Sequence, residues 1–381
     1  MKYSVRRVRS LTDIHFSEWN QLTGDTNPFL KHEFLSGLER YDCLTSHGWY
    51  PCHIIVESGK KLLAALPLYF KTNSIGEFVF DWQWAEAYEN AGGKYYPKLV
   101  SAIPFTPVTG DRCLISPGLS KQEFSKILID AAKDLANETQ ASGLHILFPD
   151  PSECKNMTNM EMMLRKGCQY HWLNQGYSDF EDFLGRLSAK RRKQIRKERK
   201  ALATPEFNIQ ILRGNEITEH HWKTFHNFYA STFYKKWGEP RFSRKFLDSL
   251  SQSMPESVLL IMARHNNNYV AGALAFEGGN TLFGRHWGCS DDFKFLHFEL
   301  CYYQTIEYCI EHGLYRLDAG AQGEHKIWRG FSPVETWSAH WLTNINFSIA
   351  IDNFLKQETR YIDSYINDLA KHTAYRHTGD S

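Results

Sequence analysis

Four ionisable side chains lie within six positions in the C-terminal part of the chain: Glu324, His325, Lys326 and Arg329. They follow residues 319–323, a segment too rich in glycine to continue a helix or a strand. A carboxylate or an imidazole can accept a proton, and an ammonium or a guanidinium can bind an anion. A solvated surface loop is the alternative, but the neighbouring Trp328 and Phe331 disfavour it because surface loops rarely carry so much apolar area. We expect a catalytic loop here, with Glu324 or His325 as the base and Lys326 as a further catalytic group.

Regular elements before this loop must position it. Apolar residues recur at intervals of three and four over residues 294–312, which predicts a helix that ends at Gly313, and residues 281–288 and 314–318 alternate as strands do. These elements supply two further candidate bases, His286 and Glu299, although a core histidine and a surface glutamate are the plainer interpretations. The expected substrate-binding residues of this region are Arg285, Trp287, Tyr302, Gln322 and Arg329.

Aromatic residues are concentrated in residues 76–107, in a chain in which Phe, Trp and Tyr make up 14% of all positions. Their rings can provide stacking surfaces in a binding cleft, although Trp and Tyr are often simply buried in a core. We expect this stretch to form the wall of a second substrate pocket, through Asp81, Trp82, Trp84, Tyr95, Tyr96 and Lys98.

Residues 190–200 carry eight basic side chains and one acidic one. An apolar stripe continues through them, so the segment 179–203 is predicted to be one helix with a docked face and a basic outer face. Such a face is often only solvated, but its concentration in a chain of formal net charge +1 favours a polyanion or a phosphate-bearing substrate. The expected anion-binding or tRNA-binding residues are Arg192, Lys193, Arg196 and Lys197.

The composition is that of a globular protein, and the length of 381 residues predicts two domains of ordinary size or, as the alternative, one large domain. The eight cysteines form no C-x-x-C pair, and no third ligand accompanies the adjacent His220 and His221, so we expect neither a disulfide framework nor a metal site. The first residues lack the apolar core of a secretion signal, and the longest apolar run, 62–70, is too short to cross a bilayer. We therefore expect a cytoplasmic protein with no integral membrane segment and no tightly bound cofactor.

The order of the predicted elements repeats along the chain. Each half runs strand, two helices, two or three antiparallel strands, helix and strand, with the second copy beginning near residue 207. We predict an α/β (α+β) protein with two copies of one unit, residues 1–176 and residues 177–381, the basic helix belonging to the second.

Several segments carry a resemblance to a known family. Residues 193–200, which follow the aromatic and acidic residues 180–183, and the pattern Gly313, Asp318, Gly320, Lys326, Gly330 and Phe331 resemble FemAB-like proteins, the aminoacyltransferases that build peptidoglycan interpeptide bridges. Residues 27–39, 77–110, 284–288, 297–314 and 319–334 resemble a bacterial branch of predicted N-acyltransferases of the same family, associated with peptidoglycan biosynthesis or recognition.

The resemblance implies two tandem acyltransferase folds of the GNAT type with a cleft between them, and transfer of an acyl or aminoacyl group to an amine. Fem enzymes use aminoacyl-tRNA and a cell-wall precursor, whereas single-domain GNAT enzymes use acyl-CoA held by a loop of the form Q/R-x-x-G-x-G/A. That loop is not found before the helix 294–312, where Ser290, Asp291, Asp292 and Phe293 would repel phosphates, so acyl-CoA is disfavoured. No G-x-S-x-G motif is present, which favours direct transfer without a covalent intermediate.

Three other functions remain open at this stage. The same fold could bind a peptide or peptidoglycan without catalysis, act as an acyl-CoA-dependent N-acetyltransferase, or bind RNA through residues 190–200 alone. In the transferase hypothesis, residues 80–98 would form the pocket for the amine acceptor, and the basic helix would guide tRNA or another anionic donor.

Overall fold

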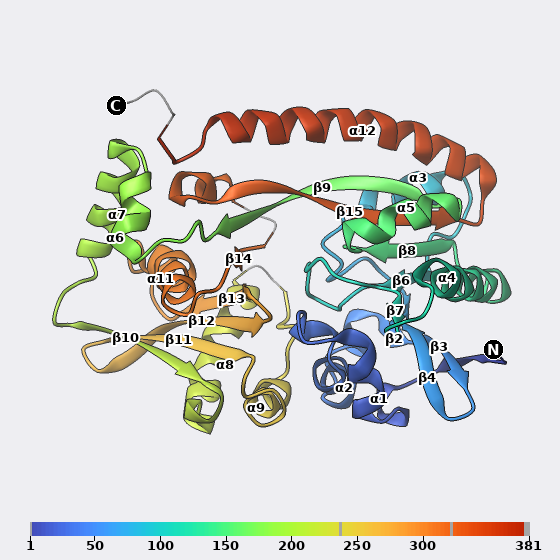
Figure 1. Ribbon diagram of the computed structural model, residues 1–381, viewed down its shortest axis with the longest axis horizontal. Coiled ribbons are helices and arrows are strands. Elements are labelled where there is room, and N and C mark those ends of the chain that lie inside the picture. The colour runs from blue at the N-terminus through green and yellow to red at the C-terminus, as the bar shows by residue number, and fades with distance from the viewer. Residues whose placement is uncertain (1, 236–237, 321–322, 377–381) are drawn as a thin grey trace. The chain divides into compact units, whose positions relative to one another are not determined.

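The computed structural model describes residues 2–235, 238–320 and 323–376 (Figure 1). Its contacts divide the chain into a first unit, Met1–Gly167 with Glu335–Ser364, and a second unit, Cys168–Val334 with Tyr365–Ser381. The chain changes unit within strand β9 (Met163–Leu173), within strand β15 (Ser332–Leu342) and within helix α12 (Ile345–Lys371). The sequence predicted one boundary, near residue 176, with all later residues in the second unit. It did not predict that residues 335–364 belong to the first unit.

The first unit contains two groups of hydrogen-bonded strands. One has the order β1-β3-β4-β7 and the other the order β15-β8-β6-β5-β2, in which β6 and β8 are parallel. The strands are β1 (Ser4–Val8), β2 (Trp49–Pro51), β3 (His53–Ser58), β4 (Lys61–Leu66), β5 (Tyr69–Lys71), β6 (Lys98–Ser101), β7 (Leu114–Ile115) and β8 (Gly143–Leu147). The helices are η1 (Leu11–Asp13), α1 (Phe16–Thr23), η2 (Pro28–Leu30), α2 (His32–Arg40), η3 (Thr45–His47), α3 (Trp82–Asn90), α4 (Lys121–Glu138) and α5 (Pro151–Asn159).

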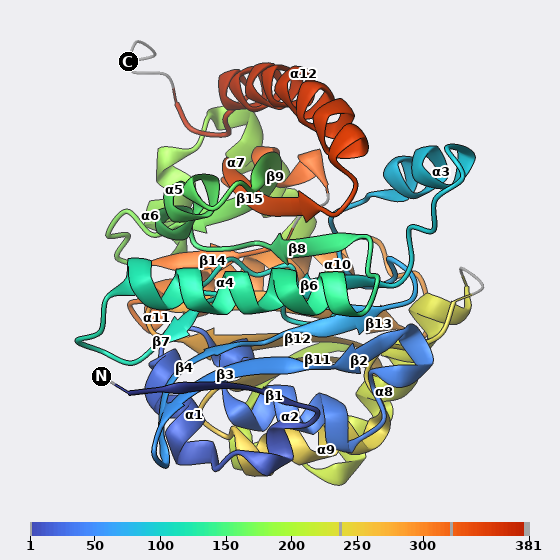
Figure 2. The same ribbon diagram turned by 90° about the vertical axis from the view of Figure 1, so that its right-hand side faces the viewer.

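Helix α4 organises the core of the first unit. Ser120 caps its first turn by accepting a hydrogen bond from the backbone N–H of Glu123 (3.2 Å). Its apolar face buries Phe124, Leu128 and Leu135 against β3, β4 and β8, and Figure 2 shows the helix lying along these strands. The helix therefore joins the two groups of strands into one core.

The second unit is built on one sheet of order β10-β11-β12-β13-β14-β9, in which only β13 and β14 are parallel neighbours. Its further strands are β10 (Phe207–Arg213), β11 (Val258–His265), β12 (Asn268–Gly278), β13 (Thr281–Cys289) and β14 (Arg316–Asp318). Its helices are α6 (Phe180–Arg186), α7 (Ala189–Lys200), η4 (Gly214–Glu216), α8 (Glu219–Tyr234), α9 (Arg244–Ser253), α10 (Leu296–Phe298), the π-helical turn η5 (Glu299–Tyr303), α11 (Gln304–Glu311) and η6 (Glu324–Arg329). Figure 1 shows α8 and α9 on the side of the sheet opposite α11.

Several predicted elements differ from the observed ones. The predicted single helix 179–203 is broken between α6 and α7, because Leu187 adopts an extended conformation and forms a β-bridge with Tyr375. The predicted flexible loop at 324–329 is the 3₁₀ helix η6. Helix α12 was not predicted.

Candidate active site in the second unit

The strands β13 and β14 part after a short parallel pairing. Thr281, Leu282 and Phe283 pair with Arg316, Leu317 and Asp318, and no described pairing continues beyond Phe283. A bulge in the pairing of β12 with β13 leaves Arg285 as the extra residue at this point, between Gly284 and His286. The resulting opening holds a cavity of about 120 Å³, which is lined by Ala273, Leu274, Ala275, Gly284, Arg285, His286, Trp287, His297, Cys301, Tyr302, Thr305 and Ala319.

Small side chains and a π-helical turn shape this cavity. Ala273 and Ala275 of β12 leave room on the sheet, and Tyr302 forms part of the opposite wall. In a π-helix, residues five positions apart lie on one face, so His297 and Tyr302 come together with ring centroids 5.4 Å apart. His297 was not predicted as a site residue, because the α-helical period places residues 297 and 302 on different faces of a helix.

The imidazoles at the cavity are neutral at neutral pH. Burial, with the charge of Arg285 in addition, lowers the pKa of His286 to about 3. Burial and the nearby His325, Lys326 and Arg329 lower the pKa of His297 to about 4. His286 packs edge-on against Tyr229 of α8 at 4.8 Å between ring centroids, so it lies on the α8 side of the sheet.

Charged groups surround the point where the strands part. Burial lowers the pKa of Arg285 to about 10, against the opposing effect of Asp318. Burial alone would raise the pKa of Asp318, but His171, the N–H of Gly320 and Arg285 outweigh it and hold the value at about 2. Asp318 is thus a buried carboxylate that partly compensates the positive charge beside the cavity.

Tyr302 connects the cavity to helix η6. Its hydroxyl lies 3.1 Å from Nε2 of His325, a half-buried residue. Burial raises the pKa of Tyr302, and burial together with Arg329 and Lys326 lowers the pKa of His325. A phenol hydrogen-bonded to a neutral imidazole can relay a proton between the cavity and the outside.

Lys326 also reaches the rim of the cavity. Its Nζ donates to the carbonyl oxygens of Ala319 (2.6 Å) and Gly320 (3.2 Å), and burial lowers its pKa to about 8. The neighbouring Glu324 is exposed and accepts a hydrogen bond from the hydroxyl of Tyr365 (2.9 Å). Of the three residues predicted on this segment, His325 and Lys326 thus lie closer to the cavity lining than Glu324 does.

The comparison with known proteins gives the family. A family model for FemAB-like proteins, described as peptidoglycan biosynthesis/recognition, matches residues 10–377. The chain belongs to the FemAB-like family. No curated protein matches the sequence.

Solved structures show the same architecture as this FemAB-like protein. The crystal structure of FemX is similar with a TM-score of 0.55 and 13% identity, over 92% of this chain and 100% of that one. The C-terminal domain of a putative lysylphosphatidylglycerol synthetase from Agrobacterium fabrum has a TM-score of 0.53 and 8% identity, over 90% and 96% of the two chains. The predicted FemAB-like membership is confirmed by the family model, and the mixed α/β fold agrees with the similarity to FemX.

Other predicted site residues of this FemAB-like chain stabilise the fold. Glu299 is buried and accepts hydrogen bonds from Gln304 (2.8 Å) and Arg199 (3.2 Å). Arg329 is buried and pairs with Glu198. The predicted substrate-binding Gln322 lies outside the described residues, whereas Arg285, Trp287 and Tyr302 all line the cavity.

The residues predicted for the acceptor pocket lie in the first unit. Lys98 is completely buried, and its Nζ donates to Ser74 Oγ (2.8 Å), Glu77 Oε2 (2.8 Å) and Asp81. Tyr95 donates to the same Asp81 carboxylate (2.7 Å). Trp84 is buried, Tyr96 is half-buried and Trp82 is exposed. Lys98, Asp81 and Tyr95 thus form a buried ionic cluster, and a role of this stretch in acceptor binding stays a prediction.

The basic helix α7 has two different faces. Lys193, Arg196 and Lys197 are exposed, with Arg196 paired to Glu181, while Arg192 is half-buried. No ion pair is found for Lys193 or Lys197 within the described residues. The single acidic residue of the run, Glu198, is buried on the opposite face. A role of this exposed face in binding an anion or tRNA stays a prediction.

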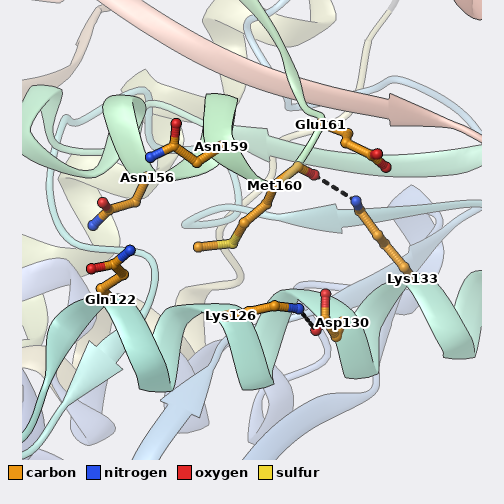
Figure 3. A pocket seen from close by; sticks show the side chains of 8 residues that line it. All are labelled: Gln122, Lys126, Asp130, Lys133, Asn156, Asn159, Met160 and Glu161. Carbon is orange, nitrogen blue, oxygen red and sulfur yellow. Dashed lines mark hydrogen bonds and ion pairs between the residues drawn. The ribbon is translucent and has the colours of Figure 1, made fainter.

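A second cavity lies in the first unit between α4 and the end of α5 (Figure 3). It measures about 440 Å³ and is lined by Gln122, Lys126, Asp130, Lys133, Asn156, Asn159, Met160 and Glu161. Lys126 pairs with Asp130, and Lys133 Nζ donates to the carbonyl oxygen of Met160 (2.6 Å). Its lining holds carboxylates and ammonium groups but, unlike the cavity at β13 and β14, no imidazole, thiol or phenol.

Metal and membrane sites find no support in the described part of the chain. Within residues 2–235, 238–320 and 323–376, no three His, Cys, Asp or Glu side chains are arranged to hold a metal ion. No helix among these residues combines the length and the apolar composition needed to span a bilayer.

Proposed function

We propose that this protein transfers an acyl or aminoacyl group from an activated donor to an amine, in the cavity where β13 and β14 part. The observation that carries the proposal is the Tyr302–His325 hydrogen bond (3.1 Å), which links a cavity-lining hydroxyl to a neutral imidazole. Family membership and the FemX-like fold support the same class of reaction.

The proposed reaction is direct attack of a neutral amine on the donor carbonyl carbon. The new C–N bond forms, and the bond from that carbon to the leaving oxygen breaks. The amine proton passes to the oxygen of Tyr302 as the phenol proton moves to Nε2 of His325, and the leaving oxygen then takes a proton back along the same path. An amine and an ester thus become an amide and an alcohol, with no covalent enzyme intermediate.

Positive charge beside the cavity would stabilise the transition state. The carbonyl oxygen becomes negative as the amine attacks, and Arg285 and Lys326 are the cations at or near the cavity lining. Asp318 is buried near them, and its negative charge partly compensates the positive charge of the two cations. In this proposal the two cations stabilise the negative charge on the carbonyl oxygen, and the Tyr302–His325 pair transfers the proton.

The donor we favour is an aminoacyl-tRNA, and the acceptor we favour is the amine of a cell-wall precursor. The exposed Lys193 and Lys197 of α7 support an anionic donor, and Asp291 and Asp292, just before α10, disfavour acyl-CoA. The description of the family supports a cell-wall acceptor.

The test is a transfer assay with the purified protein. A radiolabelled aminoacyl-tRNA pool or labelled acetyl-CoA is offered with a lysine-containing cell-wall stem peptide, and label in an alkali-stable amide is counted. The Tyr302→Phe variant should lose about 100-fold in rate. The control is Tyr308→Phe on the same helix, whose hydroxyl donates to Glu277 (2.8 Å) and does not line the cavity.

Two results would contradict the proposal. One is the absence of amide product with either donor, which would leave a non-catalytic binding protein of the same fold. The other is full activity of Tyr302→Phe with an unchanged unfolding midpoint, which would place the proton transfer elsewhere.

A further inference from the structure

A single buried guanidinium binds the backbone of His325 and the side chain of Tyr303, the neighbour of Tyr302. Arg329, which is 2% exposed, donates from Nε to the hydroxyl of Tyr303 (2.9 Å) and from Nη1 to the carbonyl oxygen of His325 (3.0 Å). From Nη2 it donates to both carboxylate oxygens of Glu198 (3.0 and 2.9 Å). All three of its nitrogen atoms are therefore used, each in a different direction.

Two of these bonds bear directly on the relay. The carbonyl that Nη1 binds belongs to His325 itself, the residue whose Nε2 meets Tyr302. The hydroxyl that Nε binds belongs to Tyr303, the chain neighbour of Tyr302 in the π-helical turn. Arg329 thus fixes the backbone of one partner and the residue next to the other.

The remaining contacts make this arrangement rigid. The guanidinium lies over the ring of Phe298, 3.6 Å from the ring centroid. Glu198 also accepts from Tyr303 through Oε2 and from Gln194 through Oε1 (3.0 Å), so its buried charge is compensated on both oxygens. A lysine would keep the positive charge but could not reproduce a planar fork with three fixed directions.

We propose that Arg329 is a positioning residue for the proton relay, acting through His325 and Tyr303 with Glu198 as its counter-charge. This inference rests on the proposed function for its catalytic meaning, but its structural content can be tested without any activity. It also explains why the acidic residue within the basic helix faces inwards: Glu198 anchors η6 from α7, while Lys193, Arg196 and Lys197 are exposed.

The test reads the tautomer of His325 by nitrogen NMR of the full-length protein labelled with ¹⁵N-histidine. The His325 signals are assigned by their loss in His325→Gln. In the natural protein we expect two well-separated ring-nitrogen shifts, because the hydrogen bond to Tyr302 holds one tautomer. In Arg329→Lys the two shifts should move towards an average, as both tautomers become populated.

The control is Arg112→Lys in the first unit. Arg112 is also completely buried and donates to four backbone carbonyls, of Val108 (2.7 Å), Leu147 (2.8 Å), Gly110 (2.9 Å) and Asp111 (3.3 Å). Its replacement by lysine removes a comparable buried guanidinium that does not contact Tyr302 or His325, so the ring-nitrogen shifts of His325 should not change.

A milder variant covers the case in which Arg329→Lys does not fold. Tyr303→Phe removes one acceptor of Arg329, and we expect partial averaging of the His325 shifts. In the transfer assay, either variant should lower kcat by about 10- to 100-fold and leave KM within about threefold, since a misplaced catalytic group acts on the chemical step.

Unchanged His325 shifts in a folded Arg329→Lys, or in Tyr303→Phe when the lysine variant does not fold, would overturn the inference. Failure of the natural protein to transfer any acyl group would instead overturn the proposed function. The NMR result would still decide whether Arg329 positions His325, so the two failures are distinguishable.

Discussion

Replacing Glu77 by glutamine should stabilise the first unit at pH 8 and have little effect at acidic pH. Glu77 and Asp81 are both buried beside one ammonium, that of Lys98. One positive charge cannot compensate two carboxylates, so one of them is better neutral. Tyr95 and Lys98 both donate to Asp81, which leaves Glu77 as the carboxylate that takes up a proton.

The magnitude follows from the pKa of Glu77. This pKa is raised from 4.5 to about 7 in total: burial raises it most and Asp81 raises it as well, while Lys98 and Lys71 lower it. Because the folded state binds this proton more tightly than the unfolded state, the corresponding stability is present below about pH 4.5 and is lost as the pH rises through 7. A difference of 2.5 units corresponds to about 3 kcal/mol at 1.36 kcal/mol per unit. Glutamine imitates the protonated form, so Glu77→Gln should recover up to about that amount at pH 8.

The assay is urea unfolding of the natural protein and of Glu77→Gln at pH 8 and pH 5. We expect the gain to shrink below about 1 kcal/mol at pH 5, where Glu77 is protonated in the folded state. The control is Asp81→Asn, which should destabilise at both pH values because Lys98 loses its close partner. A Glu77→Gln protein less stable than the natural one at pH 8, or a gain independent of pH, would refute this reasoning.

Three further predictions follow from the second unit. Tyr302→Phe should reduce the rate of acyl transfer about 100-fold in the transfer assay while leaving the thermal unfolding midpoint unchanged, since its hydroxyl bonds only the half-buried side chain of His325 among the contacts described. The double replacement of the exposed Lys193 and Lys197 by alanine should weaken tRNA binding and flatten its dependence on salt, measured by filter binding across a salt series, with a change in unfolding free energy within about 0.5 kcal/mol. Gly288→Ala should destabilise the second unit by about 1–3 kcal/mol in urea unfolding, because the added Cβ would lie 2.2 Å from the backbone carbon of Phe228; an unchanged midpoint would contradict this packing.

Local sequence patterns predicted the elements that frame the site. The apolar spacing over 294–312 and Gly313 after it predicted the helical segment that forms one wall of the cavity. The alternation over 281–288 predicted strand β13, whose Arg285 and Trp287 line the cavity. Such patterns depend only on which face of an element is buried, and they are visible in one sequence.

Long-range polar contacts could not be predicted in this way. Arg329 was expected to bind substrate from a catalytic loop, and its burial against Glu198, which lies 131 positions earlier in the sequence, was not predicted. Lys98 was likewise expected in a substrate pocket, and its buried ion pairs with Glu77 and Asp81 were not predicted. A charged residue is mostly exposed unless it is paired, and only the fold reveals the pairing.

Backbone irregularities also escaped prediction. The π-helical turn Glu299–Tyr303 inserts one residue into a helix whose period otherwise looks regular, and it is this residue that brings His297 to Tyr302. The bulge at Arg285 and the return of residues 335–364 to the first unit have no local signature either.

The central claim is that the acyl group is transferred in the cavity where β13 and β14 part, and filling that cavity tests it most directly. Ala273 lines the cavity on β12, and leucine at this position would occupy much of its volume of about 120 Å³. The measurement is the transfer rate of Ala273→Leu beside that of Ala271→Leu, a buried alanine on the same strand that does not line the cavity. We predict that transfer is lost in Ala273→Leu and retained in whatever fraction of Ala271→Leu is folded, with both rates normalised to folded protein. Undiminished transfer by a folded Ala273→Leu would contradict the assignment of the active site.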